Sequence, residues 1–138
     1  YWSGWRYVDF VRVITPERST NGQVVSGYFS IIPTTEANHQ VLSCRFILVR
    51  ADDGSATWTL EFTWTTPAAA TQSSSGWQYK LLAQKQAGAH TSLSVTVILP
   101  KGAHFTATPT LLKETSATQA SSQHALTKDL DFAVQYAL

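Results

Sequence analysis

The sequence has a single cysteine, no methionine and few charged residues. One thiol, Cys44, forms no intrachain disulfide and no site with several thiolate ligands, so the fold depends on its hydrophobic core. Its neighbours of the same parity are apolar, and we expect the thiol to point into that core. Charged residues make up 14% of the chain, and ten basic against nine acidic residues leave a formal charge of +1. Such a chain has no overall field to attract nucleic acid, so we expect no nucleic-acid partner.

Long apolar runs are also missing. No stretch approaches the roughly 20 residues that span a bilayer, and the N-terminus lacks the charged-then-apolar pattern of a signal peptide. We therefore expect no membrane insertion. The 138 residues match the size of one domain, and we expect residues 1–138 to form it. Because the chain starts at Tyr1 without a methionine, we also expect it to be the C-terminal fragment of a longer protein.

Apolar residues recur at every second position along most of the chain and at helical spacing almost nowhere, a pattern typical of strands. In the clearest example, segment 57–65, Trp58, Leu60, Phe62 and Trp64 share one parity while Thr and Glu occupy the other. Such alternation predicts a strand with one face in the core and one in solvent. We expect eight strands in all: residues 5–14, 24–32, 41–50, 57–65, 77–85, 91–99, 105–112 and 130–138.

Turn residues between neighbouring strands predict two hairpins. Six residues, Ala-Asp-Asp-Gly-Ser-Ala, separate 41–50 from 57–65 and supply turn chemistry for the first. Gly88 lies in the link between 77–85 and 91–99 and predicts the second. In each case we expect the two strands to be antiparallel neighbours in one sheet.

Three further segments complete the expected fold. Pro109 confines segment 105–112 to a sheet edge or a bulge. Segments 68–76 and 114–128 are dominated by Ser, Thr, Gln and Ala; we expect a loop in the first and a loop or a short helix in the second. Short strands with turn signals between them predict an all-β fold, an antiparallel two-sheet β-sandwich or jelly roll of about eight strands.

Two expected strands, 5–14 and 41–50, are apolar on both faces. A second layer must therefore cover the outer face of each. Either a long loop such as 68–76 covers it or, as we expect, a neighbouring copy of the chain does, which predicts a homodimer or homotrimer. The residues assigned to this interface are Trp5, Tyr7, Val11, Val13, Ile47 and Val49.

Arginine and tryptophan side chains are the candidates for ligand binding. Guanidinium groups on 5–14 and 41–50 gather if those strands lie side by side, and such a patch can hold sulfate, sialic acid or an acidic partner. Solvated arginines on a sheet face are the alternative. Tryptophan rings flanked by polar groups can stack on sugars, although aromatic residues also favour strands for packing alone. The residues assigned to ligand binding are Arg6, Arg12, Arg45, Arg50, Trp2 and Trp77.

No residue pattern indicates catalysis or a metal site. The nucleophile elbow G-x-S-x-G is missing. Two short acidic pairs supply fewer oxygens than calcium usually takes: Asp52 with Asp53, and Asp129 with Asp131. The histidines are scattered, without a pair at metal-ligand spacing: His39, His90, His104 and His124. We therefore expect no enzyme activity, no cofactor and no metal.

Two functional hypotheses from different classes fit these features. The first is an oligomeric head or protruding domain of a viral capsid or fibre protein or of a bacterial surface adhesin. Such a domain is extracellular, on a virion or cell surface, and recognises a host receptor or glycan. The second is a monomeric carbohydrate-binding module of a secreted hydrolase. Self-association of the chain favours the first hypothesis, whereas a monomer at all concentrations favours the second.

Overall fold

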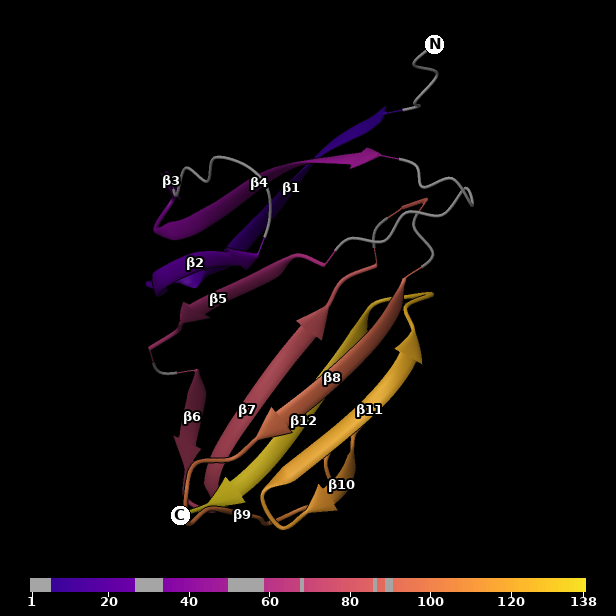
Figure 1. The fold of residues 1–138 in the computed structure, drawn as a ribbon. Helices are drawn as coiled ribbons and strands as arrows, with labels where there is room; N and C mark the ends of the chain where they lie inside the picture. The colour runs from indigo at the N-terminus through magenta and orange to yellow at the C-terminus, as the bar shows by residue number, and fades with distance from the viewer. Residues whose placement is uncertain (1–5, 27–33, 50–58, 68, 86, 89–90) are drawn as a thin grey trace. The chain divides into compact units, whose positions relative to one another are not determined.

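A computed structural model describes the chain except residues 1–5, 27–33, 50–58, 68, 86 and 89–90 (Figure 1). Its described residues form twelve strands and no helix, and every strand pairing is antiparallel. The predicted all-β class is therefore confirmed, whereas the predicted count of eight strands is wrong. The chain divides into two compact units, Tyr1–Pro67 and Ala68–Leu138. That residues 1–138 form one domain stays a prediction.

The first unit contains two small sheets. One has the strand order β1-β4-β3 and the other pairs β2 with β5. The strands are β1 (Arg6–Glu17), β2 (Thr20–Ser26), β3 (Thr34–Glu36), β4 (His39–Val49) and β5 (Glu61–Thr65).

A two-residue turn joins β3 to β4. Ala37 and Asn38 both have positive φ angles, 46° and 68°, and Glu36 pairs directly with His39. Positive φ at both central positions matches the right-handed twist of the flanking strands and makes a tight hairpin. This turn sets the register of β4, the central strand of its sheet.

Several fully buried side chains of the first unit lie at the start of β4. Val41, Leu42 and Cys44 are fully buried, which confirms the predicted burial of the thiol. Thr15 is also buried, and its hydroxyl donates a hydrogen bond to the carbonyl oxygen of Gln40 over 3.0 Å. Because the Thr15 hydroxyl has this hydrogen-bond partner, its burial avoids the desolvation penalty of an unpaired polar group.

The second unit contains one sheet of four strands and one of three (Figure 1). One has the order β6-β7-β12-β9 and the other the order β10-β11-β8. The strands are β6 (Ala70–Ser73), β7 (Gly76–Ala83), β8 (Ser92–Ile98), β9 (His104–Phe105), β10 (Lys113–Ser116), β11 (Gln119–Ala125) and β12 (Leu130–Ala137).

One hydrophobic core serves both sheets of the second unit. Phe132, Val134 and Tyr136 reach it from β12, and Val95 and Ala120 reach it from β8 and β11. The predicted apolar faces of 77–85, 91–99 and 130–138 are confirmed, since their alternate residues belong to this core or pack against it. The alternate residues that belong to the core or pack against it are Trp77, Tyr79, Leu81, Ala83, Leu93, Val95, Val97, Leu99, Leu130, Phe132, Val134 and Tyr136. Leu138 is the exception, because its side chain is 72% exposed.

Both predicted hairpins are wrong. β4 pairs with β1 and with β3, whereas β5 pairs with β2. β7 pairs with β6 and β12, whereas β8 pairs with β11 in the other sheet. β7 and β8 bury their apolar faces in one core, and they meet through side chains rather than through backbone hydrogen bonds. Turn residues between two strands therefore predicted that the chain reverses there, but not which strand each of the two pairs with.

Four strands, β3, β6, β10 and β11, were missed. β10 and β11 form a hairpin that begins at Lys113 and takes up most of 114–128, where the sequence favoured a loop or a short helix. Their residues are mostly Ser, Thr, Gln and Ala, which give little hydropathy contrast between the two faces of a strand. Ala120 shows this best, because it is fully buried but contributes only a methyl group to the core.

Two details of the expected strands need correction. Within 57–65 the strand begins only at Glu61, and Trp64 is 40% exposed rather than part of a dry face; Trp58 lies outside the described residues. Segment 105–112 is not one strand, because β9 is a two-residue edge strand and Thr110 forms an isolated bridge to Ala133. β9 lies at the edge of its sheet, as predicted for this segment, but Pro109 itself lies in no strand.

Candidate functional site

The structure tests only part of the predicted arginine patch. β1 and β4 are antiparallel neighbours. Arg45 is opposite Phe10, which has the same parity on β1 as Arg6 and Arg12, so the backbone register assigns the three arginine positions to one face of the sheet. Arg12 forms an exposed ion pair with Glu36, Nη2 to Oε1 2.7 Å. Arg50 and Trp2 lie outside the described residues. Because Glu36 already offsets the charge of Arg12, binding of an anion there stays a prediction.

The predicted oligomer interface lies on the same two strands. Val11 and Val13 are half-buried on β1. The backbone register pairs Tyr7 with Leu48, and it places Ile47 and Val49 on β4. Trp5 lies outside the described residues. In this register Val13 is opposite Leu42 whereas Ile47 is opposite Val8, so the assigned residues of β1 and those of β4 fall on opposite faces of the sheet and do not form one surface. Self-association through these strands stays a prediction.

Trp77, the remaining predicted ligand residue, is half-buried at the start of β7 and packs against the core of the second unit. It also lines a small hollow with five polar residues, which we call the polar hollow: Thr71, Ser73, Ser75, Gln78 and Gln135. The hollow has a volume of about 190 Å³. That is below the roughly 300–1,000 Å³ of sites for drug-sized ligands, so it suits a group the size of one sugar residue.

The polar hollow is built on three adjacent strands. Gln78 on β7 is directly opposite Thr71 on β6 and opposite Gln135 on β12. Directly opposed residues of antiparallel strands share a sheet face, so the three side chains form a row across the sheet. Tyr79 and Leu81 follow in the core-facing parity of β7, so this row faces away from the core.

Hydrogen bonds fix one rim of the hollow. The Ser73 and Ser75 hydroxyls lie 3.0 Å apart, and the Ser73 hydroxyl also accepts a bond from the backbone N–H of Ser75 over 3.3 Å. Gly76, which ends this turn, has a φ of 123° and lies so close to β12 that a Cβ would come within 2.6 Å of the Tyr136 carbonyl oxygen. Only glycine fits such an approach, which brings the serines beside Gln135.

Uncharged donors and acceptors line the hollow. Amide and hydroxyl groups each donate and accept hydrogen bonds, as the hydroxyl groups of a neutral sugar do. Sequence reasoning found only Trp77 of this set, because segment 68–76 carried no strand pattern. The available signal was the run of hydroxyl residues beside an alternating strand, and it becomes visible only once β6 is paired with β7.

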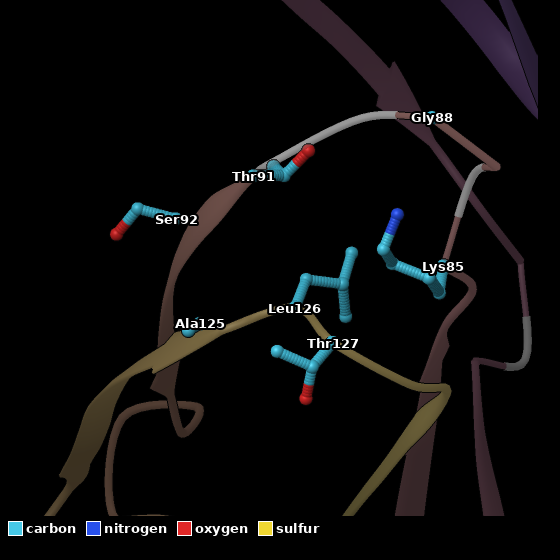
Figure 2. A pocket seen from close by; sticks show the side chains of 7 residues that line it. All are labelled: Lys85, Gly88, Thr91, Ser92, Ala125, Leu126 and Thr127. Carbon is cyan, nitrogen blue, oxygen red and sulfur yellow. The ribbon is translucent and has the colours of Figure 1, made fainter.

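A second hollow, of about 480 Å³, lies at one end of the second unit. In Figure 2 the side chains of Lys85 and Leu126 project into it, whereas the Ser92 hydroxyl points away. Leu126 is buried, and its N–H donates to the carbonyl oxygen of Thr91 over 2.8 Å. The backbone N–H of Lys85 donates to Asp129 Oδ1 over 2.7 Å. This Lys85 hollow thus combines an ammonium group with an apolar floor.

A third hollow is apolar and lies between the two sheets of the second unit, with a volume of about 470 Å³. We call it the apolar groove. One wall is the β8 stretch Val95, Thr96, Val97 and Ile98, continuing to Leu99 and Pro100. The opposite wall comes from the β6-β7-β12 side and includes Tyr79, Leu81, Val134 and Tyr136. No charged residue is among the described residues that line it.

The histidines serve local structure where the structure describes them. His39 Nδ1 lies 2.7 Å from the carbonyl oxygen of Thr15. His124 Nε2 lies 3.0 Å from the carbonyl oxygen of Leu111, and its ring is tilted against Phe132 with centroids 5.6 Å apart. In the described part of the chain no three His, Cys, Asp or Glu side chains gather as metal ligands.

Of the two predicted acidic pairs, the structure describes only the second. Asp52 and Asp53 lie outside the described residues. Asp129 accepts the Lys85 bond given above, and Asp131 is exposed on β12. His90 also lies outside the described residues, and His104 is exposed on β9.

Comparison with known proteins gives no match to a protein-family model, to a curated protein or to a solved structure. The described residues contain no helix long and apolar enough to cross a membrane.

Proposed function

We propose that this chain is a non-catalytic binding and assembly domain that recognises a neutral glycan on a host receptor and acts as an oligomer. The domain belongs to a surface-exposed head, as in a capsid protrusion, a fibre or an adhesin. Within it, the second unit is a two-sheet β-sandwich, because the sheets β6-β7-β12-β9 and β10-β11-β8 contribute to one core.

The polar hollow carries the glycan part of this proposal. Its five polar side chains carry amide or hydroxyl groups and no charge. Single hydrogen bonds of this kind contribute only about 0.5–1.5 kcal/mol each. One hollow therefore binds weakly, and an oligomer that presents several hollows gains affinity by multivalency. The low charge of the whole surface fits a neutral ligand as well.

The alternative is a monomeric carbohydrate-binding module, which uses the same hollow without assembly. The exposed Ile14 and Ile98 favour the oligomer, because large apolar side chains at 63% and 72% exposure are costly to leave in water. Sedimentation of the full chain separates the two hypotheses, since the alternative predicts one species of 15.2 kDa at every concentration.

The proposal is tested by a glycan array that holds neutral, sialylated and sulfated sugars, followed by titration of the sugars that bind. The double substitution Gln78→Ala/Gln135→Ala removes two side-chain amides from the hollow. We expect binding of a neutral glycan to weaken by about 1–3 kcal/mol, or roughly 5- to 150-fold. Gln123→Ala is the matched control, because Gln123 is exposed on β11 in the other sheet and does not line the hollow.

Two results contradict the proposal. If only sialylated or sulfated glycans bind, the neutral hollow is not the site, and Lys85→Ala then tests the Lys85 hollow. If no glycan binds, the receptor is not recognised through sugar. A neutral glycan whose affinity is equal in the glutamine variant and in the control also removes the polar hollow from consideration.

A further inference from the structure

The sheet edges of the second unit differ in how they are protected against pairing with another chain. Three edge strands carry features that natural proteins use to block such pairing. β10 has the charged residues Lys113 and Glu114 and a register shift, β9 has two residues, and β6 has four. Each of these edges is short, charged or irregular.

β8 is the exception. It has seven residues, Ser-Leu-Ser-Val-Thr-Val-Ile, with no charge and no proline. Its pairing with β11 runs without a register shift from Ser92 opposite Ala125 to Ile98 opposite Gln119. Among the described residues no strand pairs with its other edge. A row of backbone N–H and C=O groups is therefore presented on a regular, neutral edge strand, the kind that pairs most readily with another strand.

The apolar groove runs along this same strand. Thr96 and Ile98 line it from β8, and Ala69 and Ala70 line it from the neighbouring sheet. A strand added to the free edge of β8 would extend the sheet over the mouth of the groove and cover apolar surface. The free edge of β8 and the apolar groove therefore both fit the same kind of partner, an extended and uncharged strand.

We infer that this partner is β8 of a second copy, paired antiparallel about a twofold axis at Val95. In such an isologous interface both copies contribute the same strand, so each residue of β8 lies opposite a residue of β8 from the other copy. A charged residue there would meet its own like charge, and β8 has none. This inference rests on the assembly part of the proposed function and names the surface that performs it.

The alternation of β8 fits this pairing. With Val95 on the axis, Ser94 of one copy is opposite Thr96 of the other, and Leu93 is opposite Val97. Core-facing residues then meet core-facing residues, so the pairing keeps the inner face of both sheets apolar. The two three-stranded sheets become one sheet of six strands with the order β10-β11-β8-β8-β11-β10.

The dimer is expected to depend on concentration. β8 contributes seven residues to this contact, far fewer than the roughly 20–30 residues a side of a standard stable interface. Sedimentation velocity of the full chain from about 1 μM to several hundred μM, a range set by typical weak affinities, should show a monomer that converts to a dimer.

The test is the double substitution Ser94→Lys/Thr96→Lys. Both side chains are exposed, so the core is left intact. In the dimer the two substitutions place like charges directly opposite each other, and we expect the dissociation constant to rise at least tenfold. The matched control is Thr106→Lys/Thr108→Lys, which adds the same two charges at exposed positions two residues apart beside β9. It should dimerise like the unmodified chain.

Charge reversal gives the decisive measurement. Ser94→Glu/Thr96→Glu alone should also fail to dimerise, but an equal mixture with the lysine variant should form a heterodimer, because opposite charges then face each other. If the lysine variant dimerises like the unmodified chain, or if the mixture stays monomeric, the β8 pairing is overturned while assembly through another surface survives. If the unmodified chain is monomeric throughout, both the pairing and the assembly part of the proposed function are overturned.

Discussion

Among the residues whose burial the structure describes, Phe132 is the largest fully buried side chain, and its removal is the most direct test of the shared core in the second unit. It is 2% exposed on β12, which pairs with β7 on one side and β9 on the other. Its ring also contacts that of His124 on β11, in the other sheet. Phe132→Ala therefore opens a cavity between two sheets that share the surrounding residues.

Truncation of a buried phenylalanine to alanine typically costs about 3–5 kcal/mol, because transfer energy is lost and the cavity collapses only in part. Neighbours from both sheets hold the walls apart here, so we expect the upper half of that range. The stability of a whole domain is about 5–15 kcal/mol. We therefore expect the variant to fold but to unfold far more often than the unmodified chain. Phe132→Leu keeps more of the apolar volume and should lower the stability by less than Phe132→Ala.

Native-state hydrogen exchange of the β12 amides measures this loss locally, because exchange from core strands reports the free energy of opening. With one decade per 1.36 kcal/mol, protection in Phe132→Ala should fall by about three to four orders of magnitude. Leu138→Ala is the control, since Leu138 is 72% exposed and should change the free energy by no more than about 0.5 kcal/mol. A fall of less than tenfold in Phe132→Ala would refute the shared core.

Two backbone predictions follow from glycine and turn geometry. Gly76→Ala should destabilise the second unit in urea unfolding by clearly more than Gly102→Ala. Both glycines have positive φ, but only at Gly76 does a Cβ collide, with the Tyr136 carbonyl oxygen, whereas Gly102 has open space; equal losses would contradict this explanation. Ala37→Gly should raise the stability of the β3–β4 hairpin by about 0.5–1 kcal/mol in hydrogen exchange, because alanine is strained at a φ of 46°. Loss of protection there would show that the turn has another geometry.

Side-chain alternation predicted the core-facing residues of β7, β8 and β12 correctly. Trp77, Val95 and Phe132 lie at the expected parity because a strand with one dry face must place apolar side chains at every second position. This information is local, and a single sequence contains it. Trp64 shows where it fails, since an apolar residue at the right parity near the end of a short strand is still 40% exposed.

Strand partners were not predictable in the same way. The pairing of β4 with β1 joins Arg6 to Val49, more than 40 residues apart, and β5 pairs with β2 rather than with β4. Which strand takes an edge depends on competition among all strands of the fold. A turn signal such as Gly88 reports only that the chain reverses.

The candidate site was missed for a related reason. Thr71, Gln78 and Gln135 come from three strands, and only their pairing brings them into one row. Two of those strands, β7 and β12, were expected from the sequence, but each polar residue on its own looked like ordinary solvated surface. Sites built from neutral side chains leave weaker sequence signals than clusters of charges or metal ligands.

The polar hollow and the β8 edge lie on different sheets of the second unit, and this separation gives assembly a function. Pairing through β8 extends the β10-β11-β8 sheet and leaves the outward row on β6, β7 and β12 open. A dimer therefore presents two hollows at a fixed separation. Linked weak sites can gain about 10²- to 10⁴-fold in overall affinity when the ligand spans both. A hollow that offers only neutral hydrogen bonds needs such a gain in affinity to hold a receptor. Dimerisation through the unprotected β8 edge would supply that gain.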